Sequence, residues 1–146
     1  MATFMYNGGL EIIGNGGADW DDGALVFRIM LVQNGYTPNR DHRFVSDVTN
    51  ELSGTGYVRK TLAGRTVTRD DGTDKVKCDA TDPVWTGINA GTAEGAVIYK
   101  QTGGDDSSPG NDDLVCFLDF SQVTNGGDMT LQFHADGVFA FSSPST

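Results

Sequence analysis

The sequence is poor in residues that build helices. Of its 20 acidic residues 17 are aspartate and only three are glutamate, whereas 20 of its 146 residues are glycine. Glutamate favours helices, while aspartate and glycine favour turns. This composition argues against a helical bundle. It does not indicate disorder either, because 38% of the residues are apolar and aromatic residues are spread along the chain.

Basic residues are also scarce. The chain has 10 lysines and arginines, none of them in a run of three, and a net charge of −10. Binding to nucleic acids or to anionic membranes depends on clustered lysine and arginine. We therefore expect neither a nucleic acid nor a membrane among the partners. The acidic surface suits high solubility or contact with a basic protein.

Long apolar runs and cysteines are few. The longest apolar run, Ala24–Val32, is interrupted by Arg28, and no stretch has the composition of a secretory signal or a membrane-spanning helix. Cys78 and Cys116 lie among strand-like residues and are too few for a disulfide framework. We expect two buried free thiols, with one disulfide as the alternative, and synthesis without export.

Apolar runs of strand length recur between turn residues and predict an all-β fold, either an antiparallel β-sandwich or a jelly-roll-like barrel. The strongest strands are predicted at Leu25–Gln33 and Leu114–Phe120, which are apolar on both faces. One sandwich core covers only one face of a strand, so a helix, a loop or another subunit must cover the other. Weaker strands are predicted at Tyr57–Leu62, Arg65–Arg69, Lys75–Ala80, Val84–Ile88 and Ala96–Gln101.

One short helix is predicted between Asp41, which would cap it, and Gly54, which would end it. Its apolar residues recur at helical spacing, at Phe44, Val45, Val48 and Leu52. The pattern for a second helix near Phe4–Ile13 is weakened by Gly8 and Gly9.

A hairpin is predicted at the C-terminus, where two alternating stretches flank an Ala-Asp-Gly turn. A three-residue loop would pair Phe133 with Phe139. The same register pairs Leu131 with Phe141 and so buries all four large side chains together. We therefore expect a type I turn in which Gly137 is left-handed.

The chain shows no internal repeat and no linker between domains. We expect a single β domain over residues 21–146 and an N-terminal arm or short lead-in segment over residues 1–20. The long polar loop Thr102–Asp113 is expected to be mobile.

No arrangement of catalytic residues can be recognised. Catalysis needs a nucleophile or base held beside an orienting group. The only two histidines, His42 and His134, stand apart, form no zinc-ligand pair and are interpreted as solvated surface residues. No nucleophile elbow, dinucleotide-binding or P-loop pattern is present. We therefore predict that the protein is not an enzyme.

Aspartates gather in two loops. Asp19 and Asp21 lie in the first loop, and Asp70 and Asp74 lie in the second. Loops rich in carboxylate oxygens suit calcium, although neither has the spacing of an EF-hand. Ordinary turn chemistry is the main interpretation, a structural calcium ion is the alternative, and no other cofactor is expected.

Strand and turn motifs recur from about residue 20 to residue 141, at Phe27–Pro38, Asp47–Glu51, Gly54–Tyr57, Asp82–Thr86, Ala96–Lys100 and Asp136–Phe139. Together they resemble a family of small structural proteins encoded by tailed bacteriophages. The resemblance implies a virion component, with capsid decoration (cement) among its roles, and it implies no catalytic residues. The glycines of the N-terminal segment depart from the more helical opening of that family.

The resemblance further implies a homo-oligomer, a dimer or trimer on a symmetry axis, which binds the major capsid protein on the virion surface after synthesis in the bacterial cytoplasm. An extended N-terminal arm would add a strand to a neighbouring subunit. The apolar residues expected at that interface are Phe4, Tyr6, Leu10, Ile12 and Trp20.

Two alternative functions stay open. The first is a tail or fibre component. The second is a surface carbohydrate-binding module, in which Trp20 and Trp85 would stack a sugar. For both tryptophans, burial in a core or an interface is the preferred interpretation.

Overall fold

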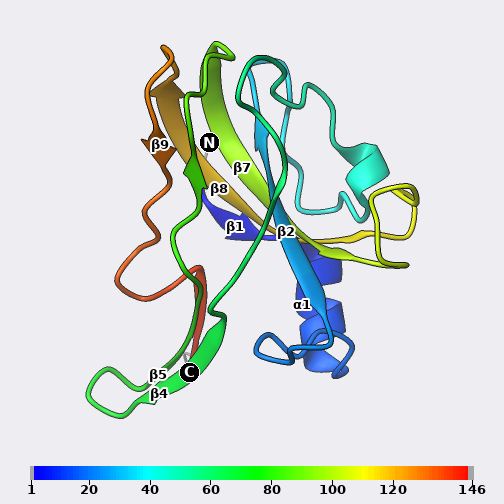
Figure 1. Ribbon diagram of the computed structural model, residues 1–146. Helices are drawn as coiled ribbons and strands as arrows, with labels where there is room; N and C mark the ends of the chain where they lie inside the picture. The colour runs from blue at the N-terminus through cyan, green and yellow to red at the C-terminus, as the bar shows by residue number, and fades with distance from the viewer. Residues whose placement is uncertain (1, 145–146) are drawn as a thin grey trace.

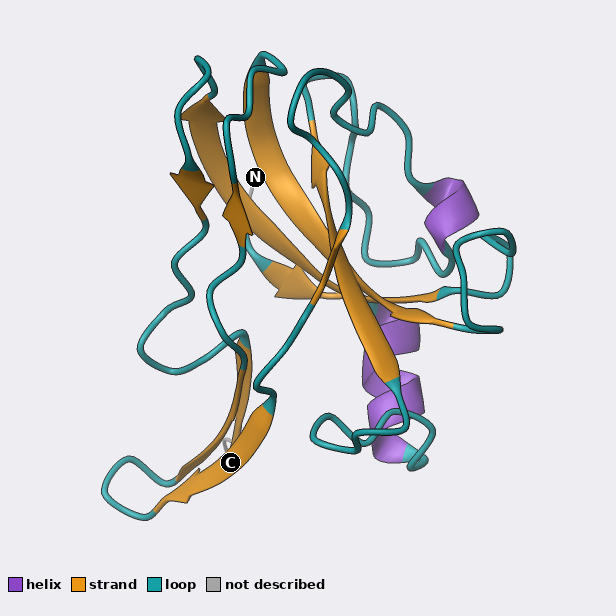
Figure 2. Cartoon of the chain, in the orientation of Figure 1, coloured by secondary structure: helices purple, strands orange, loops and turns teal. Residues whose placement is uncertain are grey.

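The computed structural model of the protein describes residues 2–144 and shows a mostly β chain folded into packed antiparallel sheets (Figure 1, Figure 2). The all-β prediction is thereby confirmed. Of the two architectures expected, these residues adopt the packed-sheet arrangement and form no closed barrel.

Three long strands form the centre of a five-stranded sheet. They are β2 (Val26–Val32), β7 (Thr92–Gln101) and β8 (Asp113–Val123). Two short strands, β1 (Phe4–Met5) and β3 (Lys60–Thr61), complete the order β1-β8-β7-β2-β3. The positions of β2 and β8 agree with the two strongest predicted strands, because long apolar runs are typical of strands buried on both faces.

The chain itself covers both faces of the central strands. On one face, Phe27 and Leu31 of β2 pack in a large cluster that includes Trp85. On the other face, Met30 packs in a second cluster with Tyr6 and Val45. Local segments, rather than another subunit, therefore provide the second cover.

The helix predicted after Asp41 is not formed. The segment contains only one 3-10 turn, η1 (Val45–Asp47), and the chain is extended again at Val48. Leu52 is buried as its apolar character predicts, but its N–H donates to the carbonyl oxygen of Leu31 at 2.8 Å. Pairing with the end of β2 has overridden the helical spacing of the apolar residues.

Within residues 2–144 the chain forms one α-helix, α1 (Asn7–Gly14). It lies in the segment where Gly8 and Gly9 weaken the helix pattern of the sequence. A Cβ atom on Gly9 would lie 2.5 Å from the carbonyl oxygen of Val115 and 2.8 Å from its Cα. Glycine therefore lets the helix lie directly on the backbone of β8, and this packing outweighs its weak helix propensity. Neither helical segment of the described chain has the length and apolar character needed to cross a membrane.

A second, three-stranded sheet extends away from the central one (Figure 1). Its order is β10 (Phe139–Ser142), β5 (Lys75–Asp79) and β4 (Thr66–Asp70). The β4–β5 hairpin and the turn at its tip lie where the sequence predicts them. A further pair joins β6 (Val84–Trp85) to β9 (Met129–Thr130).

The predicted C-terminal hairpin is wrong in its pairing. β9 pairs with β6, whereas β10 pairs with β5 and places Phe139 opposite Cys78. Only the turn agrees, since Gly137 is left-handed with φ 92° and its N–H donates to the carbonyl oxygen of His134. The Phe139 ring lies against Trp20, with centroids 4.9 Å apart. Packing against a distant segment has therefore decided the register.

Ion pairs on the polar face of this sheet involve two carboxylates. Asp70 lies 2.8 Å from Lys77, and Asp136 lies 2.8 Å from Lys75. Hydrogen bonds from Lys77 and Thr73 lower the pKa of Asp70 to about 2. The hydrogen bond from Lys75 likewise lowers the pKa of Asp136.

Acid is therefore expected to destabilise the hairpin. Asp70 has a lower pKa in the folded chain than in the unfolded one, so its contribution to stability is complete above about pH 4 and is lost as the pH falls towards 2. The melting temperature of Asp70→Asn is expected to lie below that of the wild type at pH 7 and to approach it at pH 2. Thermal melts at both pH values check this, and an equal difference at both would contradict it.

Candidate docking groove

The five residues predicted at an N-terminal interface do not form one surface. Tyr6 and Trp20 are 0% and 3% exposed, so the fold buries both side chains almost completely within their own chain. Tyr6 is buried because β1 and α1 pack on β8 of their own chain, whereas the Trp20 ring packs against Phe27 and Phe139. Leu10 is 44% exposed on α1, and Phe4 and Ile12 are half-buried.

The two tryptophans are anchored in the interior. The indole N–H of Trp20 donates to the carbonyl oxygen of Asp79 at 2.8 Å, and that of Trp85 donates to the carbonyl oxygen of Val58 at 2.7 Å. Both rings are buried. Neither offers a face to a sugar, so the carbohydrate-binding alternative loses the two residues on which it depended.

The aspartates considered as calcium ligands do not converge. Asp70 pairs with Lys77, while Asp74 ends the same turn with a φ of 55°. Asp19 and Asp21 lie in the other loop and are hydrogen-bonded to each other. Within residues 2–144, no three histidine, cysteine, aspartate or glutamate side chains are grouped closely enough to hold a metal ion.

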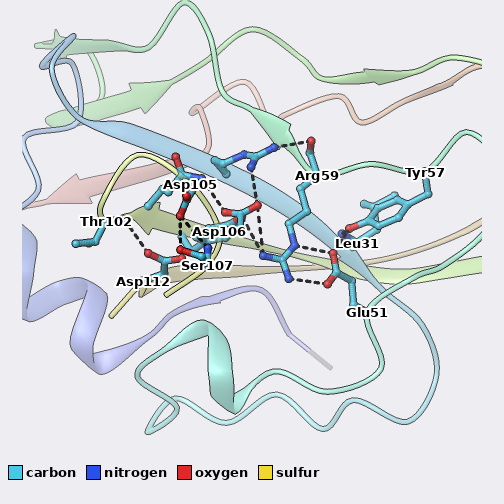
Figure 3. A network of polar contacts seen from close by, with 12 residues as sticks. Leu31, Glu51, Tyr57, Arg59, Thr102, Asp105, Asp106, Ser107 and Asp112 are labelled. Atoms are coloured by element: carbon cyan, nitrogen blue, oxygen red, sulfur yellow. Dashed lines mark hydrogen bonds and ion pairs between the residues drawn. The ribbon is translucent and has the colours of Figure 1, made fainter. Parts of the chain in front are cut away.

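A polar network joins the segment before β3 to the central sheet (Figure 3). The Nε and Nη2 atoms of Arg59 donate to the two carboxylate oxygens of Glu51, both at 2.7 Å. The hydroxyl of Tyr57 donates to the same carboxylate at 2.7 Å. The hydrogen bonds that Arg59 donates to Glu51 raise the pKa of Arg59, and burial raises the pKa of Tyr57. The guanidinium of Arg59 and the carboxylate of Glu51 thus match each other in charge and geometry.

The same network holds the loop after β7. Asp106 accepts hydrogen bonds from Arg28 at 2.6 Å, from Tyr99 at 2.8 Å and from Gln101 at 2.7 Å. Burial raises the pKa of Asp106, but these bonds and the nearby guanidinium groups outweigh that effect and lower it. The loop expected to be mobile is therefore hydrogen-bonded to the sheet (Figure 3). This geometry fits an anchor better than a substrate site.

The histidines do not activate a nucleophile. His134 is exposed, as expected. His42 differs from the expectation because it is half-buried, with Nδ1 3.0 Å from the hydroxyl of Tyr36. Burial raises the pKa of Tyr36, so this phenol stays protonated and is a poor nucleophile at neutral pH.

The two cysteines are free and buried. Burial raises the pKa of Cys78 to about 11 and raises that of Cys116 as well. Because the thiolate is the reactive form, both thiols are inert at neutral pH.

An apolar groove of about 270 Å³ lies between the end of α1 and the face of the three-stranded sheet that contacts Trp20. We call it the Trp20 groove. One wall comes from residues 13–20 and the other from β4, β5 and β10. The side chains that define its apolar lining are Ile13, Trp20, Val67, Val76, Phe139 and Phe141.

Strand register brings this lining together. Val67 lies opposite Cys78, and Cys78 lies opposite Phe139, so the three share one face of the sheet. Val67 is 42% exposed, which leaves part of the apolar wall in contact with solvent. The volume is below the range of about 300–1,000 Å³ typical of small-molecule pockets. It suits one or two side chains of a protein partner.

The groove has an acidic rim. Asp19 lines it directly, and Asp21 and Asp22 follow in the same loop. The hydrogen bond with Asp21 raises the pKa of Asp19, and the two neighbouring negative charges raise it further. The nearby cation, Arg65, donates its hydrogen bonds to backbone carbonyl groups, including that of Trp20, and interacts at longer range with the charges of Asp22 and Asp21. An apolar group joined to a positive charge would complement this arrangement.

Sequence analysis identified Trp20 and Asp19 but not the groove, because its other wall comes from strands distant in the chain. No protein-family model matches this chain, and neither the curated proteins nor the solved structures include a significant match to it.

Proposed function

We propose that the protein is a non-enzymatic structural component of a tailed-bacteriophage virion. In this role it is a decoration or cement protein that binds the outer surface of the head and stabilises the joints between capsomers. The observation that carries the proposal is the Trp20 groove with its acidic rim, which suits protein side chains rather than a substrate. The strand and turn motifs that resemble the phage family support the same role.

The groove suggests how the contact works. A segment of the major capsid protein would place a large apolar side chain against Val67 and Phe141, with a neighbouring lysine or arginine facing Asp19. Burial of apolar surface contributes about 25 cal/mol per Å², and the charge pair adds specificity. Each contact is weak, but a shell repeats the site many times, so bound copies stabilise the assembled form by mass action.

Removing the acidic rim is expected to weaken binding to phage heads. In the double variant Asp19→Asn with Asp21→Asn, we expect the dissociation constant to rise about tenfold, because the basic residue of the partner loses its counter-charge. Cosedimentation with purified heads that lack the protein measures this.

A matched control removes the same charge elsewhere, by Asp74→Asn with Asp105→Asn, and is expected to bind like the wild type. Equal binding by both double variants would exclude the groove as the contact. Recovery of the wild type with tails and not with heads would support the tail alternative.

A further inference from the structure

The outer edge of β4 is open. This strand stands last in the order β10-β5-β4, and Thr66–Arg69 are exposed. Figure 1 shows the hairpin extending away from the central sheet. Within residues 2–144, β4 is the longest strand with a neighbour on one side only.

The pairing of β5 shows which groups of β4 point outward. The carbonyl oxygen of Cys78 accepts a hydrogen bond from the chain at the start of β10, so Cys78 faces β10. Successive residues of a strand face opposite sides, so Lys77 faces β4 and bonds Thr68, its opposite residue. The backbone N–H and C=O groups of Val67 and Arg69 therefore point away from the sheet.

Proteins guard sheet edges with proline, bulges, a covering segment, short strands or charged side chains. β4 is short and carries Arg69 and Asp70, but neither proline nor a bulge protects it. β4 contains no proline and pairs with β5 in an unbroken register. Three consecutive β-branched residues, Thr66–Thr68, favour the extended conformation that a paired strand needs.

We propose that β4 pairs in antiparallel fashion with β4 of a second copy, about a two-fold axis at Thr68. Outward-facing residues must oppose one another in such a ladder. In this register Val67 faces Arg69 of the second copy, and Thr66 faces Asp70. No like charges are opposed.

The neighbouring registers are disfavoured by charge. Centring the axis on Val67 sets Arg65 against Arg69 of the second copy, and centring it on Arg69 sets two identical arginines against each other. Like charges directly opposite are destabilising. Of the registers centred on Val67, Thr68 and Arg69, the Thr68 register alone opposes no like charges. The edge is self-complementary in that register, which favours a second copy over an unrelated strand.

The pairing would build a six-stranded sheet from two chains. Its two-fold axis runs perpendicular to the sheet, so the two Trp20 grooves lie on the same side. One dimer would then contact the proposed shell at two points. The β4–β4 dimer is a specific form of the self-association that the proposed function requires. Only its contact with the shell rests on that function.

The test uses opposite charges at one exposed position. Sedimentation equilibrium of the full chain is expected to give twice 15.6 kDa at high concentration. Val67→Lys sets a second cation against Arg69 of the other copy, twice per dimer, and is expected to raise the dimer dissociation constant about tenfold. Val67→Glu removes the same apolar group but supplies an opposite charge, and its dimer is expected to be at least as tight as that of the wild type.

Thermal melts of both variants confirm folding, since the Val67 side chain is 42% exposed. A wild type that stays monomeric at about 1 mM overturns the proposal. An equal effect of the two substitutions, or none, overturns it as well, because in the Thr68 register residue 67 faces the positive charge of Arg69. A dimer that fails to bind heads would instead refute the proposed function and leave this inference standing.

Discussion

Replacing Gly9 by alanine is expected to destabilise the protein by about 2–3 kcal/mol, although alanine favours a helix by about 1 kcal/mol. The new Cβ would lie 2.5 Å from the carbonyl oxygen of Val115, a backbone atom that cannot rotate away. The helix α1 must therefore move off β8 and lose part of its packing. Urea unfolding followed by tryptophan fluorescence measures the change.

Gly14 provides the matched control in the same helix. A Cβ atom there would have no neighbour within 4 Å, so Gly14→Ala is expected to be neutral or to stabilise by about 0.5–1 kcal/mol. Equal effects of the two substitutions would show that α1 does not lie against the backbone of β8.

Replacing Asp106 by alanine is expected to destabilise the protein by about 2 kcal/mol. The substitution leaves the guanidinium of Arg28, the hydroxyl of Tyr99 and the amide of Gln101 without their shared acceptor. Both side chains of the Asp106–Arg28 pair are partly exposed, at 27% and 21%, so solvent screens the ion pair and limits the loss. Hydrogen exchange is expected to accelerate in the loop after β7 as its anchor is lost.

The adjacent aspartate is the control. Asp105 is exposed, and it accepts hydrogen bonds from the backbone N–H and the hydroxyl of Ser107 in its own turn. Asp105→Ala is therefore expected to change stability by less than about 1 kcal/mol. Loop exchange that is unchanged in Asp106→Ala would contradict the anchoring role.

The sequence predicted the strands whose burial pattern is unambiguous. β2 and β8 carry apolar side chains on both faces, and the β4–β5 hairpin combines alternation with a turn rich in aspartate and glycine. These signals are local, so a single sequence reveals them. The scarcity of glutamate likewise predicted a chain with little helix.

The errors arose where distant segments decide the local structure. Gly9 weakens a helix in isolation but permits the close contact with Val115 that holds α1 in place. Leu52 has helical spacing but pairs with the end of β2. Phe139 was predicted to pair with Phe133, but its ring packs against Trp20.

The candidate site was only partly visible for the same reason. Asp19 and Trp20 stand out in the sequence, yet the opposite wall of the Trp20 groove comes from three strands between residues 66 and 142. Register places Val67 and Phe139 on one face, and register between non-adjacent strands cannot be derived from local alternation.

The central claim is that this chain is a subunit of the outer capsid surface. A cryo-electron microscopy reconstruction of phage heads from virions shown to contain the protein tests the claim most directly. The account predicts density of this β fold outside the shell, at the joints between capsomers, with the Trp20 groove turned towards the capsid. Heads that lack this density in virions shown to contain the protein would contradict it.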